Sequence, residues 1–343
     1  MLETYLRIFI ASTNGSHRSY PRGVPPRLVL GVDAGGTSTR ALLAAADGTR
    51  LGTGTGGGAN QRSSSGSPVS GLARALAGAL AGRDPREVAV AVVGIAGSAA
   101  AGHGRAQQVL DEACRQVRLT APALLVTDIA IAHAGGSSAT NGTVLLSGTG
   151  AVAAAVAAGQ VTARSDGYGW LLGDTGSAVW LGLTAVRRAL AALDGRAPAT
   201  ALLAAVVHDL APHHDGDVGQ ALVAVADTLR PAELGRLAPL VGRVAEAGDA
   251  VASDLVAEAA DALLASLDAV RRAARDEGVP VIGGSVLTTG GPVARLVSRG
   301  IVDRCGRSPA VVHDAAAGAA VLALMHLTGT HVADEVHRRL TAR

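Results

Sequence analysis

The chain has 343 residues, of which 48% are apolar and only 2% are aromatic. This length allows two ordinary domains, whose cores must be built from Ala, Val and Leu. The net charge of +2 is too balanced for a nucleic-acid-binding surface, and no apolar run reaches the ~18 residues of a membrane span. We therefore expect neither a nucleic-acid partner nor a membrane partner.

Two features bear on where the protein works. Cys114 and Cys305 lie far apart without Cys or His neighbours at metal-ligand spacing, which indicates thiols in a reducing cytosol. Residues 1–26 differ from the rest in their aromatic and arginine content, and they make a poor signal peptide because Glu3 precedes the short apolar run. We interpret them as a loosely ordered N-terminal extension and expect a cytoplasmic protein.

The most informative segment is residues 31–40, which read Gly-Val-Asp-Ala-Gly-Gly-Thr-Ser-Thr-Arg. Apolar runs on both sides predict two strands joined by a glycine-bent turn. An acid at a strand end and bare backbone N–H groups suit a phosphate that carries Mg²⁺. We predict that Asp33 holds Mg²⁺ through water and that the nucleotide phosphates contact Gly35, Gly36, Thr37 and Thr39.

This turn is not a Walker loop, because the chain contains no lysine. A phosphate loop that ends in Gly-Lys-Ser/Thr is therefore excluded. The lysine of a protein kinase, a pyridoxal Schiff base and a Ser-Lys dyad are excluded by the same observation. A protein that handles ATP without lysine must use backbone amides, hydroxyls, Mg²⁺ and arginine.

A candidate general base follows the first domain's last strand. The expected elements that lead to it are strands and helices at residues 50–54, 70–81, 88–93, 107–117 and 123–126. Asp128 stands directly after the last of these strands, where a carboxylate can take the proton of an attacking hydroxyl. The alternative is that Asp128 caps a helix that begins at Ile129.

The opening pattern then returns. A strand at 143–146, the turn Ser147-Gly148-Thr149-Gly150 and strands at 151–156 and 161–164 repeat the first strand–turn–strand arrangement about 110 residues later. The repeat suggests two related domains that face one another, and two unrelated hairpins in a glycine-rich chain remain the alternative. The remaining expected elements are helices at 178–275, a strand at 279–282, Gly283-Gly284-Ser285, a helix at 292–298, a strand at 311–312 and a small-residue helix at 314–327. The small residues of this last helix allow it to pack tightly, back across the first domain.

In this order, the motifs at residues 33–39, 147–150 and 283–286 resemble the sugar kinase/actin/heat-shock-chaperone superfamily. Gly173-Asp174-Thr175-Gly176-Ser177 resembles the Gly-Asp-Glu-Gly-Ser of the N-acetylglucosamine kinases in the BadF/BadG/BcrA/BcrD ATPase-type branch, with Thr175 in place of Glu. The resemblance covers roughly residues 27–327. It implies two α/β domains of the RNase H-like, actin-like ATPase type, with a nucleotide and sugar cleft between them. We place them at residues 27–133 with 315–343, and at 134–314.

The resemblance also implies roles for individual residues. By this resemblance both turns bind the ATP phosphates, so Gly148, Thr149 and Gly150 join the phosphate contacts predicted for the first turn. Gly283, Gly284 and Ser285 flank the adenosine. Asp128 is the catalytic base and contacts the sugar. The other implied sugar contacts are Asn60, Gly167, Tyr168 and Asp174. The family's aromatic residue two positions after Asn60 is absent here.

Aromatic side chains support this sugar site. Tyr168, Trp170 and Trp180 lie within thirteen residues, although the cores otherwise lack aromatic rings. A ring suits the C–H face of a sugar, so Tyr168 is the expected platform. Trp180 fits a core position better. Packing of all three at a domain interface is the alternative.

We therefore predict an ATP-dependent kinase that converts N-acetylglucosamine to N-acetylglucosamine 6-phosphate with Mg²⁺. A related hexosamine kinase for glucosamine, N-acetylmuramic acid or N-acetylmannosamine is the first alternative. An activator ATPase would need cysteines for a shared iron–sulfur cluster, and a sugar-sensing repressor would need a helix-turn-helix that residues 1–26 are too short to form. The oligomeric state is open, with a homodimer as one option.

Overall fold

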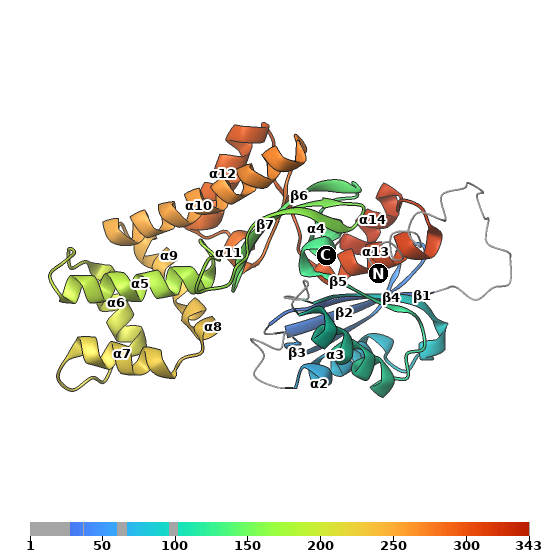
Figure 1. Ribbon diagram of the computed structural model, residues 1–343, viewed down its shortest axis with the longest axis horizontal. Helices are drawn as coiled ribbons and strands as arrows, with labels where there is room; N and C mark the ends of the chain where they lie inside the picture. The colour runs from blue at the N-terminus through green and yellow to red at the C-terminus, as the bar shows by residue number, and fades with distance from the viewer. Residues whose placement is uncertain (1–27, 37, 60–66, 96–101, 343) are drawn as a thin grey trace. The chain divides into compact units, whose positions relative to one another are not determined.

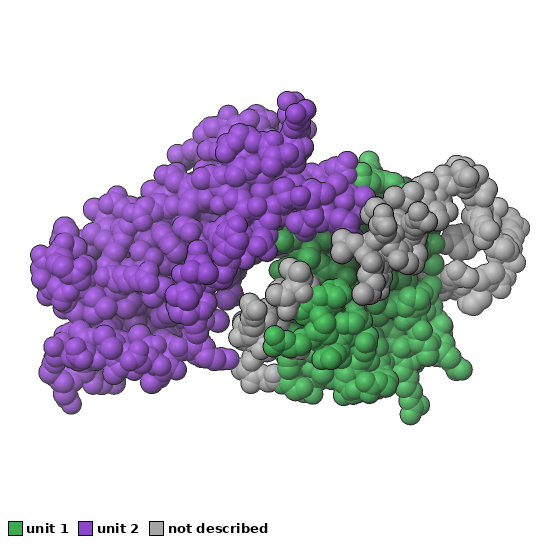
Figure 2. Space-filling view, in the orientation of Figure 1, with its two compact units in different colours: residues 1–140, 314–343 green, residues 141–313 purple. Residues whose placement is uncertain are grey.

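The computed structural model describes residues 28–36, 38–59, 67–95 and 102–342. The N-terminal extension, Thr37 and Asn60 lie outside these residues. The chain divides into two compact units, residues 1–140 with 314–343 (unit 1) and residues 141–313 (unit 2) (Figure 2). None of the helices in the described part of the chain is long and apolar enough to cross a membrane.

Unit 1 is a five-stranded sheet covered by helices on both faces. Its strand order is β3-β2-β1-β4-β5. The strands are β1 (Leu28–Ala34), β2 (Ser38–Ala45), β3 (Arg50–Gly57), β4 (Val88–Ile95) and β5 (Ala123–Thr127). The first three form an antiparallel meander, and β4 and β5 run parallel to β1.

Alternating apolar residues explain the two covered faces. Leu30 belongs to the core beneath α2 (Pro68–Leu80) and α3 (His103–Gln116), whereas its neighbour Val29 belongs to the core on the opposite face. The helices on that opposite face are α4 (Asp128–Gly136), α13 (Ala315–Thr328) and α14 (Asp334–Thr341) (Figure 1). A short 3-10 helix, η1 (Pro85–Glu87), precedes β4.

Small residues let α13 approach β1 and α4 closely. A Cβ at Gly31 would collide with the carbonyl oxygen of Ala316 in α13, and a Cβ at Gly318 would collide with that of Ile131 in α4. Close backbone packing of this kind adds dispersion contacts that larger side chains would prevent. The predicted tight packing of this helix is therefore confirmed, and it returns the C-terminal segment to the first sheet.

Unit 2 repeats the same meander and adds a helical region. Its sheet order is β10-β9-β6-β7-β8. The strands are β6 (Asn141–Ser147), β7 (Ala151–Ala157), β8 (Gln160–Asp166), β9 (Val281–Gly283) and β10 (Ala310–Val311). The helices are α5 (Ala178–Leu193), α6 (Ala201–Leu210), α7 (Val218–Thr228), α8 (Pro231–Leu234), η2 (Gly235–Leu237), α9 (Ala238–Glu246), α10 (Ala250–Ala274), α11 (Ser285–Thr288) and α12 (Pro292–Cys305).

The boundary between the units lies after α4. Residue 140 ends the first segment of unit 1, seven residues beyond the position expected from sequence. The reason is that α4 packs along α13, with Ile131 and Ala134 in the same core as Ala316 and Ala320. The chain leaves unit 1 only where β6 begins at Asn141.

Candidate active site

Asp33 lies at the end of β1, the central strand of the unit 1 sheet. In the register of the sheet, Asp33 lies opposite Arg40 of β2 and opposite Gly94 of β4. Burial, and to a smaller extent the charges of Asp128 and Asp314, raise the pKa of Asp33 to about 6, although Arg40 acts to lower it. A carboxylate with this pKa is ionised at neutral pH and gains from a nearby cation.

The turn after Asp33 has a fixed backbone. The N–H of Gly35 donates to the carbonyl of Ser38 at 3.0 Å, and its carbonyl accepts from Ala59 at 3.0 Å. Gly36 is half-buried in the same turn. Thr39 is fully buried, and its hydroxyl donates to the carbonyl of Gly57 at 2.7 Å. The Thr39 hydroxyl, which was expected to contact a phosphate, thus joins β2 to β3 instead.

Asp128 is the first residue of α4, directly after β5. The cap of this helix is Thr127, whose hydroxyl accepts from the N–H of Ala130 at 3.2 Å, while one oxygen of Asp128 accepts from Ile129 at 3.1 Å. Asp128 is therefore not the N-cap of this helix; the preceding residue, Thr127, is. Burial raises the pKa of Asp128, which suits a group that must accept a proton.

Asp33 and Asp128 share one edge of the sheet. Strands β1, β4 and β5 are parallel neighbours, so their carboxyl ends meet there. Asp314, which sequence reasoning missed, adds a third negative charge: it caps α13 and pairs with Arg50 at 2.8 Å. The sequence could have indicated it, because an Asp directly before a run of small helical residues is a typical N-cap.

Unit 2 brings two glycine segments side by side. The turn after β6 is closed by a hydrogen bond from Gly148 to the carbonyl of Gly150 at 2.9 Å, and the carbonyl of Gly148 accepts from Ala178 at 2.8 Å. A Cβ at Gly148 would lie 3.6 Å from the backbone nitrogen of Ser285 and 3.7 Å from the Cα of Gly284. The predicted phosphate turn and the predicted adenosine segment are therefore neighbours.

Residues of these two segments differ in their surroundings. Thr149, Gly284 and Ser285 are exposed, as groups that bind a ligand must be. Gly284 has φ +86°, and a Cβ there would lie 2.9 Å from the nitrogen of Gly148, so no side chain fits. Gly283 is buried in β9, where a Cβ would collide with Leu146 and Val312. Its glycine is required by packing.

A loop between β8 and α5 holds the predicted sugar residues. Asp174 adopts a left-handed conformation with φ +56°, and one of its oxygens accepts from the N–H of Gly169 at 3.2 Å. A Cβ at Gly150 would lie 2.7 Å from the other oxygen of Asp174. Burial raises the pKa of Asp174. Gly167, with φ +76°, turns the chain into this loop.

The aromatic side chains separate into two groups. Tyr168 is 64% exposed and Trp170 is 44% exposed, while Trp180 packs against the unit 2 core, as expected from sequence. The guanidinium of Arg164 lies 5.3 Å from the centre of the Tyr168 ring. Tyr168 therefore offers a ring at the surface beside Asp174, as a sugar platform requires.

The donors of unit 1 fit Mg²⁺ in the manner expected for nucleotide sites. No group of three or more His, Cys, Asp or Glu side chains that could hold a metal occurs in the described ranges. Mg²⁺ commonly keeps several waters and takes only one or two carboxylates together with substrate phosphates. Asp33, ionised and paired with a second carboxylate at the same sheet edge, supplies that donor type.

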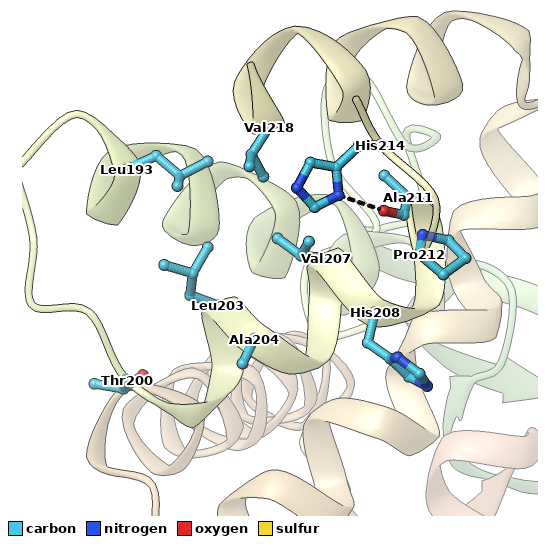
Figure 3. A pocket seen from close by; sticks show the side chains of 10 residues that line it. All are labelled: Leu193, Thr200, Leu203, Ala204, Val207, His208, Ala211, Pro212, His214 and Val218. Carbon is cyan, nitrogen blue, oxygen red and sulfur yellow. Dashed lines mark hydrogen bonds between the residues drawn. The ribbon is translucent and has the colours of Figure 1, made fainter. Parts of the chain in front are cut away.

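A separate cavity of about 470 Å³ lies in the helical region of unit 2 (Figure 3). It is lined by the end of α5, by α6 and by the start of α7. His208 and His214 are among its lining residues, and Nδ1 of His214 makes a hydrogen bond with the carbonyl of Ala211 at 2.9 Å. None of the predicted site residues that the structure describes lines this cavity.

The sequence is similar to a known family and to known sugar kinases. The sequence model of the BadF/BadG/BcrA/BcrD ATPase family matches residues 30–323. An N-acetylmuramic acid/N-acetylglucosamine kinase from Clostridium acetobutylicum is 27% identical over 276 residues, which are 79% of this chain and 87% of that protein. An N-acetyl-D-glucosamine kinase from Dictyostelium discoideum is 28% identical over 193 residues, 53% of this chain and 59% of that protein.

Solved structures show the same fold. A candidate N-acetylglucosamine kinase from Chromobacterium violaceum has a TM-score of 0.64 at 26% identity, covering 87% of this chain and 99% of that one. A ROK family glucokinase from Streptomyces griseus, in complex with glucose and AMPPNP, has a TM-score of 0.51 at 20% identity, covering 86% and 98%. The predicted fold class, two α/β domains of the actin-like ATPase type, is confirmed.

Proposed function

The chain belongs to the BadF/BadG/BcrA/BcrD ATPase family, and from that premise we propose that it phosphorylates N-acetylglucosamine with ATP to give N-acetylglucosamine 6-phosphate. The observation that carries the proposal is the position of Asp128, a half-buried residue whose carboxyl has a raised pKa and lies at the same sheet edge as Asp33. Sugar kinases among the relatives support an acceptor hydroxyl instead of water.

Asp128 acts as the general base. As the sugar oxygen bonds to the γ-phosphorus, the bond between that phosphorus and the β–γ bridging oxygen breaks and ADP leaves. The hydroxyl proton passes to the Asp128 carboxylate. Because the helix cap is made by Thr127, Asp128 retains an oxygen for this task.

We place the phosphates at the turn after β1 and at the turn after β6. In unit 1 the proposed contacts are Gly36 and Thr37, the latter outside the described residues, while the N–H of Gly35 shapes the turn by donating to Ser38. In unit 2 they are Thr149 and Gly150, while the N–H of Gly148 closes the turn; Gly283, Gly284 and Ser285 stand beside the adenosine. Bound Mg²⁺ would neutralise charge on the phosphates, and Asp33 would hold it through water.

The sugar is recognised by the loop after β8. The carboxylate of Asp174 can accept hydrogen bonds from adjacent sugar hydroxyls, and Tyr168 offers its exposed ring. Gly167 and Asn60 are the other proposed sugar contacts. A site built from such hydrogen bonds rejects sugars that lack the hydroxyls it reads.

N-acetylmuramic acid is a second candidate substrate. The relative from Clostridium acetobutylicum is named for both sugars. N-acetylmuramic acid carries a carboxylate, and the guanidinium of Arg164 on the Tyr168 ring places a cation at the sugar loop. The activator-ATPase alternative loses support because Cys114 is buried in the unit 1 core, where it could not share an iron–sulfur cluster.

An ADP-release assay tests the proposal. Turnover is measured with N-acetylglucosamine, N-acetylmuramic acid, N-acetylmannosamine, glucosamine and glucose, and we expect the N-acetylated sugars to be preferred. Asp128→Asn should reduce kcat by roughly 10³-fold or more while ATP binding, followed by calorimetry, stays unchanged. Release of ADP that does not depend on any sugar would contradict the kinase proposal and favour an ATPase.

Two further properties stay proposals. ATP as a substrate supports a cytoplasmic location. A homodimer is one option for the assembly, and light scattering coupled to size-exclusion chromatography would measure the oligomeric state.

A further inference from the structure

Asp166 occupies an unusual position at the end of β8. Its backbone is left-handed, with φ +63°, and Gly167 follows with φ +76°. One carboxylate oxygen accepts from the N–H of Asp174 at 2.7 Å, and the other accepts from the N–H of Thr175 at 2.9 Å. A Cβ at residue 173 would collide with the first of these oxygens, so Gly173 is what permits the approach.

These two hydrogen bonds hold the backbone at Asp174, the residue proposed to bind the sugar. Asp174 is itself left-handed, with φ +56°, which costs free energy in any residue that has a Cβ. Charge-assisted bonds to carboxylates are roughly twice as strong as neutral ones, so they can hold this backbone in place. Once held, the Asp174 carboxylate reaches Gly169 of the sugar loop and lies against Gly150 of the phosphate turn.

We propose that Asp166 is a positioning residue that fixes the Asp174 carboxylate for amino-sugar binding. The inference rests on the proposed kinase function. It also accounts for Thr175: where the resembled motif has Glu, this chain has no charge at that residue, and the acid beside Asp174 comes from β8 instead. Asp166 itself takes no part in phosphoryl transfer.

The charge of Asp166 gives the proposal a second, independent readout. Its carboxylate raises the pKa of Asp174 by repulsion, in addition to the larger effect of burial, while hydrogen bonds from Gly169 and Ala151 lower it. Asp166 is the one acid among these contributions. Removing its charge should lower the pKa of Asp174 and move the acidic limb of kcat/KM for the sugar to lower pH.

The test substitution is Asp166→Asn, because Asn tolerates a left-handed backbone and keeps the side-chain shape. The amide nitrogen cannot accept from an N–H, so one of the two hydrogen bonds and the charge are lost together. We expect KM for N-acetylglucosamine to rise about 10-fold, with kcat and the KM for ATP changed less than about 2-fold. The matched control is Asp249→Asn, because the two carboxylate oxygens of Asp249 also accept one backbone N–H each, from Ala252 and Leu202, elsewhere in unit 2.

A double-mutant comparison separates positioning from general stability. If Asp166 works through Asp174, Asp166→Asn should add little to the loss of kcat/KM caused by Asp174→Asn alone. An equal loss in both backgrounds, an unchanged sugar KM, or an acidic limb that does not move would overturn the inference. The wild type distinguishes the two proposals: if it shows no sugar-dependent turnover and no sugar-induced rise in Tm, the kinase proposal itself has failed.

Discussion

Replacing Asp33 by Asn should stabilise the protein at alkaline pH while it removes the Mg²⁺-binding carboxylate. The raised pKa means that the folded protein disfavours the ionised form of Asp33 relative to the unfolded chain. Asn has nearly the same shape and carries no charge, so the substitution removes this penalty without creating a cavity. A site that binds a cation is expected to carry such a penalty when the cation is absent.

The magnitude follows from the shift itself. Raising the pKa of Asp33 from 3.8 to about 6 corresponds to about 3 kcal/mol at 1.36 kcal/mol per unit. Because the folded-state pKa is the higher one, the favourable contribution of protonated Asp33 is fully present below pH 3.8 and is lost as the pH rises through 6. The gain from Asn should therefore reach about 3 kcal/mol near pH 8 and vanish below pH 4.

Thermal unfolding of both proteins from pH 4 to pH 8, without nucleotide or Mg²⁺, measures this difference. A gain of about 3 kcal/mol raises Tm by roughly 6–12 °C for a unit of this size. The control is Asp47→Asn in the same unit: hydrogen bonds from Thr49 lower the pKa of Asp47, so this change should not stabilise at alkaline pH. A Tm gain for the Asp33 variant that is absent at pH 8, or that persists unchanged at pH 4, would refute the reasoning.

Three other predictions follow from the site and the packing. Because Asp33 must be ionised to hold Mg²⁺, kcat/KM for ATP should fall as the pH drops through about 6; a pH–rate profile at saturating sugar measures it, separately from the sugar limb on which Asp174 acts. Gly284→Ala should raise KM for ATP and lower Tm, since its φ of +86° strains any side chain. Gly318→Ala should destabilise unit 1 by about 1–3 kcal/mol in denaturant unfolding, whereas Gly104→Ala, whose Cβ meets open space, should not.

Local patterns in the sequence predicted most of the helices and strands, their order and the chemistry expected of the site. Strand alternation, glycine turns and a helix of small residues are local signals, so they predicted the two meanders, the phosphate turn at residues 147–150 and the close packing of α13 on unit 1. The order of the motifs predicted the fold class and the family, which the comparisons confirmed. The individual site residues stay predictions that only experiments on this protein can test.

Tertiary structure decided which groups meet, because such contacts join segments that are distant in the chain or depend on one hydrogen bond. The hydroxyl of Thr39 donates to the carbonyl of Gly57, and Thr127 caps α4. The sequence alone cannot show which partner a threonine hydroxyl takes, or which of two adjacent polar residues caps a helix. Asp314 reaches the neighbourhood of Asp33 only because α13 packs against β1. Asp166 faces Asp174 only because two successive left-handed residues turn the chain back after β8.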